Sequence, residues 1–264
     1  MDNIKRLSVV FLVVLTVFYC TAKGQQKEKI DFNVKRTDKE LRYSQFVNSI
    51  SYIKLDNNAF ITRIKTIKYV NDNFYVHDDK AQSIFIFDKW GKFLSQIKRF
   101  GRGPEEYKSI TTFDINRVKN EIHILDLSGN KIIVYSNKGD FVRTVKLNNN
   151  DLPRDFISLD NENYLFYSND NPKKSKRRVW KTDKTGKFLK QLIKSENRQF
   201  SHHYYLPRYL VRIGQTDQIG LISDIDKTWY HIQKGKVISS NFLDLNVNVS
   251  EDILMKRTVK CNNR

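Results

Sequence analysis

The feature that constrains this chain most is an internal repeat with a period of about 48 residues. The first copy spans 74–94 and the second 122–142, and every matched position is offset by 48 residues. A third copy at 164–189 and a fourth at 219–238 are more degenerate. Self-similarity at this period indicates a repeat architecture. One turn glycine recurs at intervals of 48, 47 and 49 residues, at Gly91, Gly139, Gly186 and Gly235.

Each copy predicts four short strands. Apolar and polar residues alternate between turn signals, which is typical of half-buried antiparallel strands. The recurring glycine supplies the positive φ that a tight hairpin needs. We expect first strands at 61–70 and 110–115 and a fourth strand at 93–97, with no long helical period after residue 24. Four-stranded repeats of about 40–50 residues are characteristic of β-propeller blades. The predicted fold is therefore an all-β propeller of four-stranded antiparallel blades, four of them recognisable.

The first copy also carries a family resemblance. Its segments 74–78 and 84–93, followed by the Gly-Arg-Gly-Pro-Glu-Glu-Tyr link at 101–107, resemble those of exported bacterial six-bladed β-propeller proteins related to NHL repeats. The resemblance covers about residues 50–245 and is strongest over 61–147. It implies six blades. It also draws attention to Asp72 and Asp114, because some six-bladed propeller enzymes keep calcium-binding or acid–base residues near the inner strand ends.

The length conflicts with six blades. Six blades of about 48 residues need about 290 residues, whereas removal of residues 1–24 leaves 264 − 24 = 240. We expect a truncated six-bladed ring, with a shortened propeller as the alternative. A strand-like run at Ser49 to Leu55 is a candidate to close the ring by joining the last blade. The predicted organisation is a signal peptide at 1–24, an N-terminal extension at 25–48, blades at 49–250, and a polar tail or the start of a missing blade at 251–264.

The N-terminus predicts export. Lys5 and Arg6 precede an apolar run at 7–19, which is too short to cross about 30 Å of hydrocarbon. Small residues at Ala22 and Gly24 suit cleavage after Gly24. We expect a protein of the periplasm or cell surface. A lipid anchor at Cys20 is the alternative, although the preceding residue is a bulky tyrosine where lipoprotein signals have a small one.

The net positive charge of the chain limits the classes of binding partner that we expect. Lys and Arg number 47 against 29 Asp and Glu, a formal net charge of +18. In the cytoplasm this excess would suggest nucleic acid, but outside it the available polyanions are acidic polysaccharides, lipid head groups and surface polymers. The basic run Lys173–Arg178 is interpreted as a solvated hairpin tip, with a polyanion-binding loop as the alternative. Two cysteines exclude a disulfide scaffold and a Cys-rich zinc module.

Candidate binding residues lie in the loops that join the second strand to the third and one blade to the next. In a propeller these loops gather on one face, and loops on a rigid scaffold usually carry function. The alternative for Asp78 and Asp126 is that they accept backbone N–H bonds within their own turns, and their recurrence at one repeat position favours it. The predicted binding residues are Asp78, Asp79, Arg102, Glu105, Asp126 and Arg154.

No catalytic motif is present: the sequence lacks a Gly-x-Ser-x-Gly elbow, a His-Glu-x-x-His pair and a phosphate-binding glycine loop. His202 and His203 are adjacent and so point to opposite faces of a strand. We predict no metal site and no cofactor. The expected function is a monomeric, non-enzymatic binding module for an envelope protein or polysaccharide, such as an acidic glycan, and not for nucleic acid. The alternatives are an NHL-propeller-type hydrolase or lyase with a metal in the central channel, which requires three or more converging Asp, Glu or His side chains, and a non-functional truncated paralogue.

Overall fold

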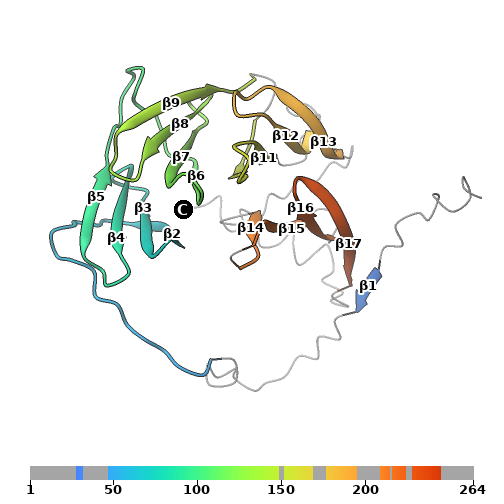
Figure 1. The fold of residues 1–264 in the computed structure, drawn as a ribbon, viewed down its shortest axis with the longest axis horizontal. Helices are drawn as coiled ribbons and strands as arrows, with labels where there is room; N and C mark the ends of the chain where they lie inside the picture. The colour runs from blue at the N-terminus through green and yellow to red at the C-terminus, as the bar shows by residue number, and fades with distance from the viewer. Residues whose placement is uncertain are drawn as a thin grey trace, which may run out of the picture.

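The computed structural model describes residues 28–31, 47–148, 152–168, 177–194, 209–214, 216–223 and 228–244. In these residues the secondary structure is all β, arranged as four sheets around a common centre (Figure 1). The strands are β1 (Glu28–Asp31), β2 (Ile64–Val70), β3 (Asn73–Asp78), β4 (Ser83–Asp88), β5 (Phe93–Ile97), β6 (Thr112–Asn116), β7 (Glu121–Asp126), β8 (Lys131–Ser136), β9 (Phe141–Lys146), β10 (Asp155–Ser158), β11 (Tyr164–Tyr167), β12 (Arg177–Thr182), β13 (Phe188–Lys194), β14 (Leu210–Arg212), β15 (Gln218–Ser223), β16 (Thr228–Gln233) and β17 (Lys236–Asp244).

Each sheet is one sequence repeat, so the prediction of four-stranded antiparallel blades is confirmed. The orders of the repeat strands are β2-β3-β4-β5, β6-β7-β8-β9, β10-β11-β12-β13 and β14-β15-β16-β17, and β1 adds a fifth strand to the last sheet, beside β17. The first strand of each sheet lies nearest the centre and the fourth lies outermost (Figure 1). All four repeat glycines have positive φ, from +68° at Gly235 to +91° at Gly139, as the hairpin interpretation requires.

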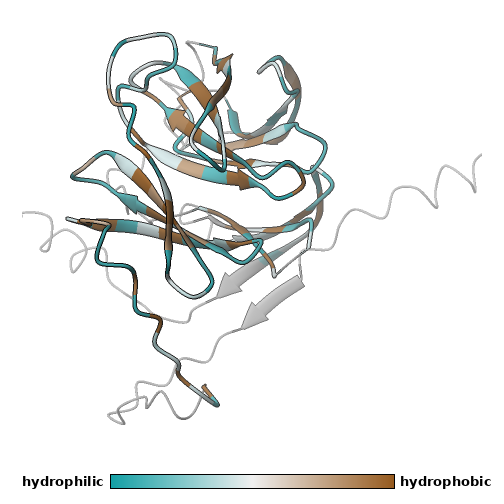
Figure 2. Ribbon diagram, turned by 60° about the vertical axis from the view of Figure 1, so that its left-hand side comes forward, coloured by the Kyte–Doolittle hydropathy of each residue, from teal (hydrophilic) through white to brown (hydrophobic). Residues whose placement is uncertain are grey.

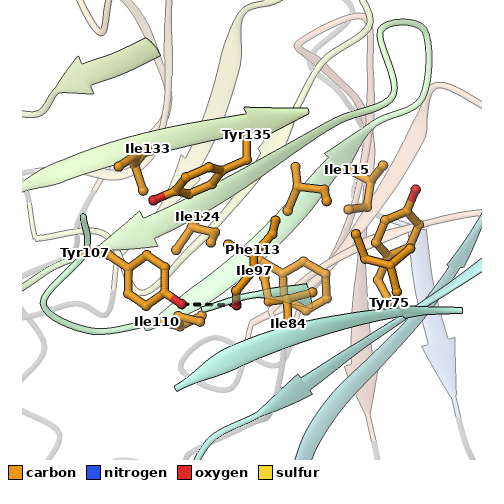
Figure 3. Packing of buried hydrophobic residues seen from close by; sticks show 12 residues of the cluster. Tyr75, Ile84, Ile97, Tyr107, Ile110, Phe113, Ile115, Ile124, Ile133 and Tyr135 are labelled. Atoms are coloured by element: carbon orange, nitrogen blue, oxygen red, sulfur yellow. Dashed lines mark hydrogen bonds between the residues drawn. The ribbon is translucent and has the colours of Figure 1, made fainter. Parts of the chain in front are cut away.

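Neighbouring sheets pack face to face and share the core. Tyr75, Ile84 and Ile97 of the first blade meet Phe113 and Ile124 of the second in one apolar cluster (Figure 3). A second cluster joins the second blade to the third, and another joins the third to the fourth. Hydrophobic and hydrophilic stretches both occur along the strands (Figure 2). The outer strands β5 and β9 alternate between more buried and exposed residues, whereas the middle strands β4 and β8 are buried along almost their whole length. The half-buried pattern expected from the sequence is therefore wrong for the middle strands, because their sheets pack against a neighbour on both faces.

The expected closing strand at 49–55 is wrong. These residues form no strand, and the segment that follows packs on the first blade instead. Leu55, Ala59 and Ile61 contact a cluster formed by Val76, Phe85 and Phe87, and Asp56 N–H donates to Gly91 O over 2.8 Å. The strand that does join the last blade is β1, which pairs in parallel with β17. The segment at 49–61 covers an apolar face that the first blade would otherwise expose.

The basic run also differs from expectation at its end. Residues 173–176 lie outside the described residues, but Arg177 and Arg178 belong to β12. Arg178 is 1% exposed, and its guanidinium lies 6.0 Å from the ring centroid of Tyr230 in the fourth blade. A solvated tip is therefore wrong for Arg178, because strand alternation turns this side chain toward the next blade. The signal peptide, Cys20, His202, His203 and the tail at 251–264 lie outside the described residues. In the part of the chain that is described, no helix is long and apolar enough to cross a membrane.

Candidate functional site

A cluster of charged groups lies at the centre of the ring, with one contribution from the innermost strand of each blade. Asp114 of β6 accepts a hydrogen bond from Lys68 Nζ of β2 through Oδ1. Its Oδ2 accepts from Ser158 N–H of β10 at 2.9 Å and from Arg212 Nη2 of β14 at 3.3 Å. Arg212 Nη2 also donates to the carbonyl oxygen of Ser158. We call these four residues the central cluster.

Burial makes the central cluster energetically important. The side chains of Lys68 and Asp114 are 7% and 6% exposed, and that of Arg212 is 15% exposed. Lys68 Nζ also lies 4.9 Å from the ring centroid of Phe113, within cation–π range. A buried carboxylate is tolerated only when it is paired and hydrogen-bonded. Asp114 meets this requirement with donors from the other three blades, so it ties the four sheets together.

The central cluster does not offer the ligands of a metal site. Two cations surround one carboxylate, and hard divalent cations prefer several oxygen ligands. Across the residues that the structure describes, no group of three or more His, Cys, Asp or Glu side chains is placed to hold a metal. The sequence drew attention to Asp114 but missed Lys68, Ser158 and Arg212. The available signal was a charged residue flanked by apolar neighbours in an inner strand, as in Ile67-Lys68-Tyr69 and Val211-Arg212-Ile213.

Asp78 and Asp126 are buried at the ends of β3 and β7, next to the loops that join the second strand to the third. Asp78 accepts hydrogen bonds from Thr62 N–H at 2.5 Å, Arg63 N–H at 3.2 Å and Ala81 N–H at 3.0 Å. Burial raises the pKa of Asp78, but these hydrogen bonds outweigh it and lower the pKa to about 2. Asp126 accepts from Lys108 N–H and Gly129 N–H, each at 2.9 Å. Both carboxylates fasten the segment that enters their blade, in agreement with the backbone-capping alternative.

The remaining predicted residues occupy exposed or partly exposed loops. Asp79 pairs with Arg63 at 2.5 Å and Lys65 at 3.6 Å. Arg102 and Glu105 are exposed in the link between the first two blades, and Arg154 is exposed in the next link. Among the described residues no hydrogen bond or ion pair joins these last three side chains, so their role in binding stays a prediction.

The Gly-Arg-Gly-Pro-Glu-Glu-Tyr link is shaped by its own side chains. Glu106 folds back so that its Oε2 accepts from Gly103 N–H at 2.8 Å, and a Cβ on Gly101 would lie 2.0 Å from the same oxygen. Tyr107 is fully buried and donates to the carbonyl oxygen of Gln82 at 2.7 Å. Burial raises its pKa to about 12. This internal fastening leaves Arg102 on the outside of the link.

By strand topology, the loops that follow the second and fourth strands lie at this end of the blades, and we call them the linker face, comprising residues 62–65, 78–83, 97–111, 126–131, 146–148 and 152–155. Most of its acidic groups are not available to bind a ligand, because Asp78, Asp126 and Asp155 are buried and Asp79 is ion-paired. Of the described residues of this face, Glu105 is the only exposed carboxylate. The exposed cations are Arg63, Lys65, Lys80, Lys98, Arg99, Arg102, Lys108, Lys146 and Arg154.

The opposite end of the blades, the turn face, is formed by residues 70–73, 88–93, 116–121, 136–141, 159–164 and 182–188. Its charges are balanced by pairing. Asp72 lies 3.9 Å from Lys89, Asp160 lies 3.9 Å from Arg117, and Glu162 pairs with Lys119. Among the described residues the two faces therefore differ in charge: the linker face has more cations than carboxylates, and the turn face has equal numbers of the two.

Four sheets of four antiparallel strands, with innermost strands converging on shared polar contacts, define this protein as a β-propeller. It belongs to the family described as "Domain of unknown function (DUF4934)", whose model matches residues 27–263. No curated protein matches the chain.

Two solved structures are similar to the chain, and the first of them supports the fold. A "Putative exported protein" from Bacteroides fragilis NCTC 9343 is 19% identical, with a TM-score of 0.61 over 74% of this chain and 55% of that one. A member of the DUF4221 family from Bacteroides vulgatus ATCC 8482 is 11% identical, with a TM-score of 0.48 over 70% of this chain and 59% of that one. The chain thus spans a little over half the length of these two proteins.

Proposed function

We propose that this protein is an exported, non-enzymatic binding module whose linker face adsorbs an anionic polymer, with acidic glycans as the ligand class. The observation that carries this proposal is the composition of that face. Most of its carboxylates are buried in backbone capping or paired with Arg63 and Lys65, with Glu105 as the exposed exception, whereas most of its lysines and arginines remain in solvent. A surface of one sign raises the local concentration of the opposite sign and speeds association.

The proposal implies binding that is sensitive to salt and distributed over many contacts. Exposed charges separated by more than about 8–10 Å are screened at physiological ionic strength, so affinity arises where a polymer touches several cations at once. Arg102 and Arg154 are well placed to contribute because they project from successive links between blades. A small monovalent anion would gain little from this face.

The test is retention on an immobilised acidic polysaccharide at low and high salt. Arg102→Glu with Arg154→Glu should weaken binding about tenfold, since each exposed pair contributes up to ~1 kcal/mol. The matched control is Lys138→Glu with Lys187→Glu, which makes the same charge change on the turn face and should bind like the wild type. Retention that does not respond to salt, or an equal loss in both double variants, would contradict the proposal.

We also propose that the protein is exported and that its blades belong to a six-bladed ring. The signal-like residues 1–24 support secretion, with a lipid anchor at Cys20 as the alternative. N-terminal sequencing of protein from cell fractions distinguishes them, because cleavage after Gly24 removes Cys20 whereas an acylated chain starts at it. The six-bladed ring remains a prediction from the repeat, and the four described blades account for part of such a ring.

A further inference from the structure

A cavity of about 370 Å³ lies between the second and third blades, which are neighbours in the ring (Figure 1). Its walls come from the outer strand β9, through Arg143, Thr144 and Val145, and from turns on the turn face, through Lys119, Glu162, Lys184 and Thr185. The volume falls within the range of about 300–1,000 Å³ that is usual for small-molecule sites. The cavity belongs neither to the linker face nor to the central cluster.

One wall of the cavity is held rigidly. Asp183 Oδ1 accepts from Thr185 N–H at 2.8 Å, from Thr185 Oγ1 at 2.7 Å and from Lys187 N–H at 3.0 Å. Gly186 then packs so closely on β9 that a Cβ would lie 2.5 Å from the carbonyl oxygen of Lys146. The turn that carries Lys184 and Thr185 is therefore fixed against the second blade before any ligand arrives.

The polar groups of the cavity combine positive charge with hydrogen-bond acceptors. Glu162 pairs with Lys119 and lies 3.9 Å from Lys184 Nζ. Both carboxylate oxygens of Glu121 are 3.0 Å from Nη1 of Arg143. Among the lining residues, three cations (Lys119, Arg143 and Lys184) thus face one carboxylate (Glu162), so the lining has an excess of positive charge, and Thr144 and Thr185 add hydroxyl groups.

Glu162 has an unusual backbone for its residue type. Its φ is +64°, in the left-handed region, and the equivalent positions of the first two blades hold Asp72 and Asn120 at +59° and +53°. Asp and Asn are the side chains that tolerate this conformation, whereas Glu is not favoured in it. The third blade thus holds a longer carboxylate, at a conformational cost, at the position that places it between two lysines. Strain of this kind is a reason to look for function.

We propose that this cavity binds a single carboxylated sugar, a uronic acid unit. The lysines and the arginine form ion pairs with the carboxylate of the sugar. Glu162 and the two threonine hydroxyls form hydrogen bonds with its hydroxyl groups, and Val145 provides an apolar contact for its C–H face. A simple inorganic anion would use the cations alone and would be repelled by Glu162. The ligand therefore needs both an anionic group and hydroxyl groups.

The test measures dissociation constants of the full-length mature protein for glucuronate, glucose and inorganic sulfate by calorimetry or NMR titration. Glucuronate should bind at least tenfold more tightly than glucose. Lys119→Gln with Lys184→Gln should weaken glucuronate at least tenfold, and these lysines are 46% and 66% exposed, so the fold is retained. Lys138→Gln with Lys187→Gln removes the same charge from the turn face outside the cavity and should leave glucuronate binding unchanged.

Glu162→Asn gives the sharpest outcome, because Asn suits the left-handed backbone. It should weaken glucuronate and strengthen sulfate. Equal binding of glucuronate and glucose, no effect of the Lys119/Lys184 pair, or stronger binding of both anions to Glu162→Asn would each overturn the proposal. The cavity is separate from the linker face, so loss of glucuronate with intact polysaccharide retention in the lysine variant separates the two proposals.

Discussion

At the scale of single residues, one repeat position shows how the blades are fastened. Asp78 and Asp126 end the second strands of their blades and accept N–H groups from the segments that enter those blades. In the third blade Ser168 holds this position and donates to the carbonyl oxygen of Leu152 at 3.0 Å. The polarity of the bond is reversed, but the entering segment is still held. The third repeat therefore differs from the first two in the residue type at this position, but the side chain still holds the entering segment in place.

His77 predicts a pH dependence of stability. It is 1% exposed, and burial and the nearby Lys65 lower its pKa from 6.5 to about 4. Between pH 6.5 and 4 the histidine is protonated in the unfolded chain but stays neutral in the folded chain. The free energy of unfolding is therefore unaffected by His77 above pH 6.5 and decreases as the pH falls from 6.5 toward 4. The loss should reach roughly 2–3 kcal/mol.

Urea unfolding at intervals between pH 7.5 and 4.5 measures this loss. His77→Phe keeps an aromatic ring beside Phe113, which lies 6.1 Å from the histidine ring between centroids, and should flatten the slope in that window. An unchanged slope in this variant would show that other groups cause the acid destabilisation.

At the scale of elements, the same hairpin glycine has different surroundings in different blades. Gly91 and Gly139 have φ values of +83° and +91°. A Cβ on Gly91 would lie 2.2 Å from the carbonyl oxygen of Lys54, in the segment that covers the first blade, whereas the nearest atom for Gly139 is the carbonyl oxygen of Gln96 at 3.5 Å. The first glycine is required for conformation and for space, and the second for conformation alone.

Gly139→Ala should cost about 1 kcal/mol, the price of a left-handed alanine. Gly91→Ala should cost about 2–4 kcal/mol, because a clash with backbone adds to the strain. Denaturant unfolding of the two variants measures the difference. Equal costs would mean that the segment at 49–61 moves aside without loss of stability.

The strands were predictable because their signal is local. Alternation and turn glycines placed 93–97 as the fourth strand, as observed, and put the other strands of the first blades within a few residues. The run at 49–55 misled because its apolar residues suit a strand, yet tertiary packing uses the segment as a cover for the first blade. The central cluster escaped prediction because Lys68, Asp114 and Arg212 lie far apart in sequence and meet only after all four blades form.

At the scale of the whole molecule, Asp114 is the residue on which the blades converge. Asp114→Ala should lower the free energy of unfolding by about 3–5 kcal/mol, because it leaves Lys68 and Arg212 buried without their carboxylate. Asp160→Ala is the matched control, since the side chain of Asp160 is 42% exposed and its removal should cost less than about 0.5 kcal/mol. Thermal or urea unfolding measures the free energy of unfolding of both variants. Similar losses in the two variants would show that Asp114 does not hold the blades together.

The difference in charge between the two ends of the blades has a consequence for orientation. In the described part of the chain, unbalanced cations at one end of the blades and balanced charges at the other give an electric dipole that runs between the two faces. Near a negatively charged surface this dipole orients the molecule during its approach, so that the linker face contacts the surface first. The turn face, with the cavity between the second and third blades, then points outward into the medium.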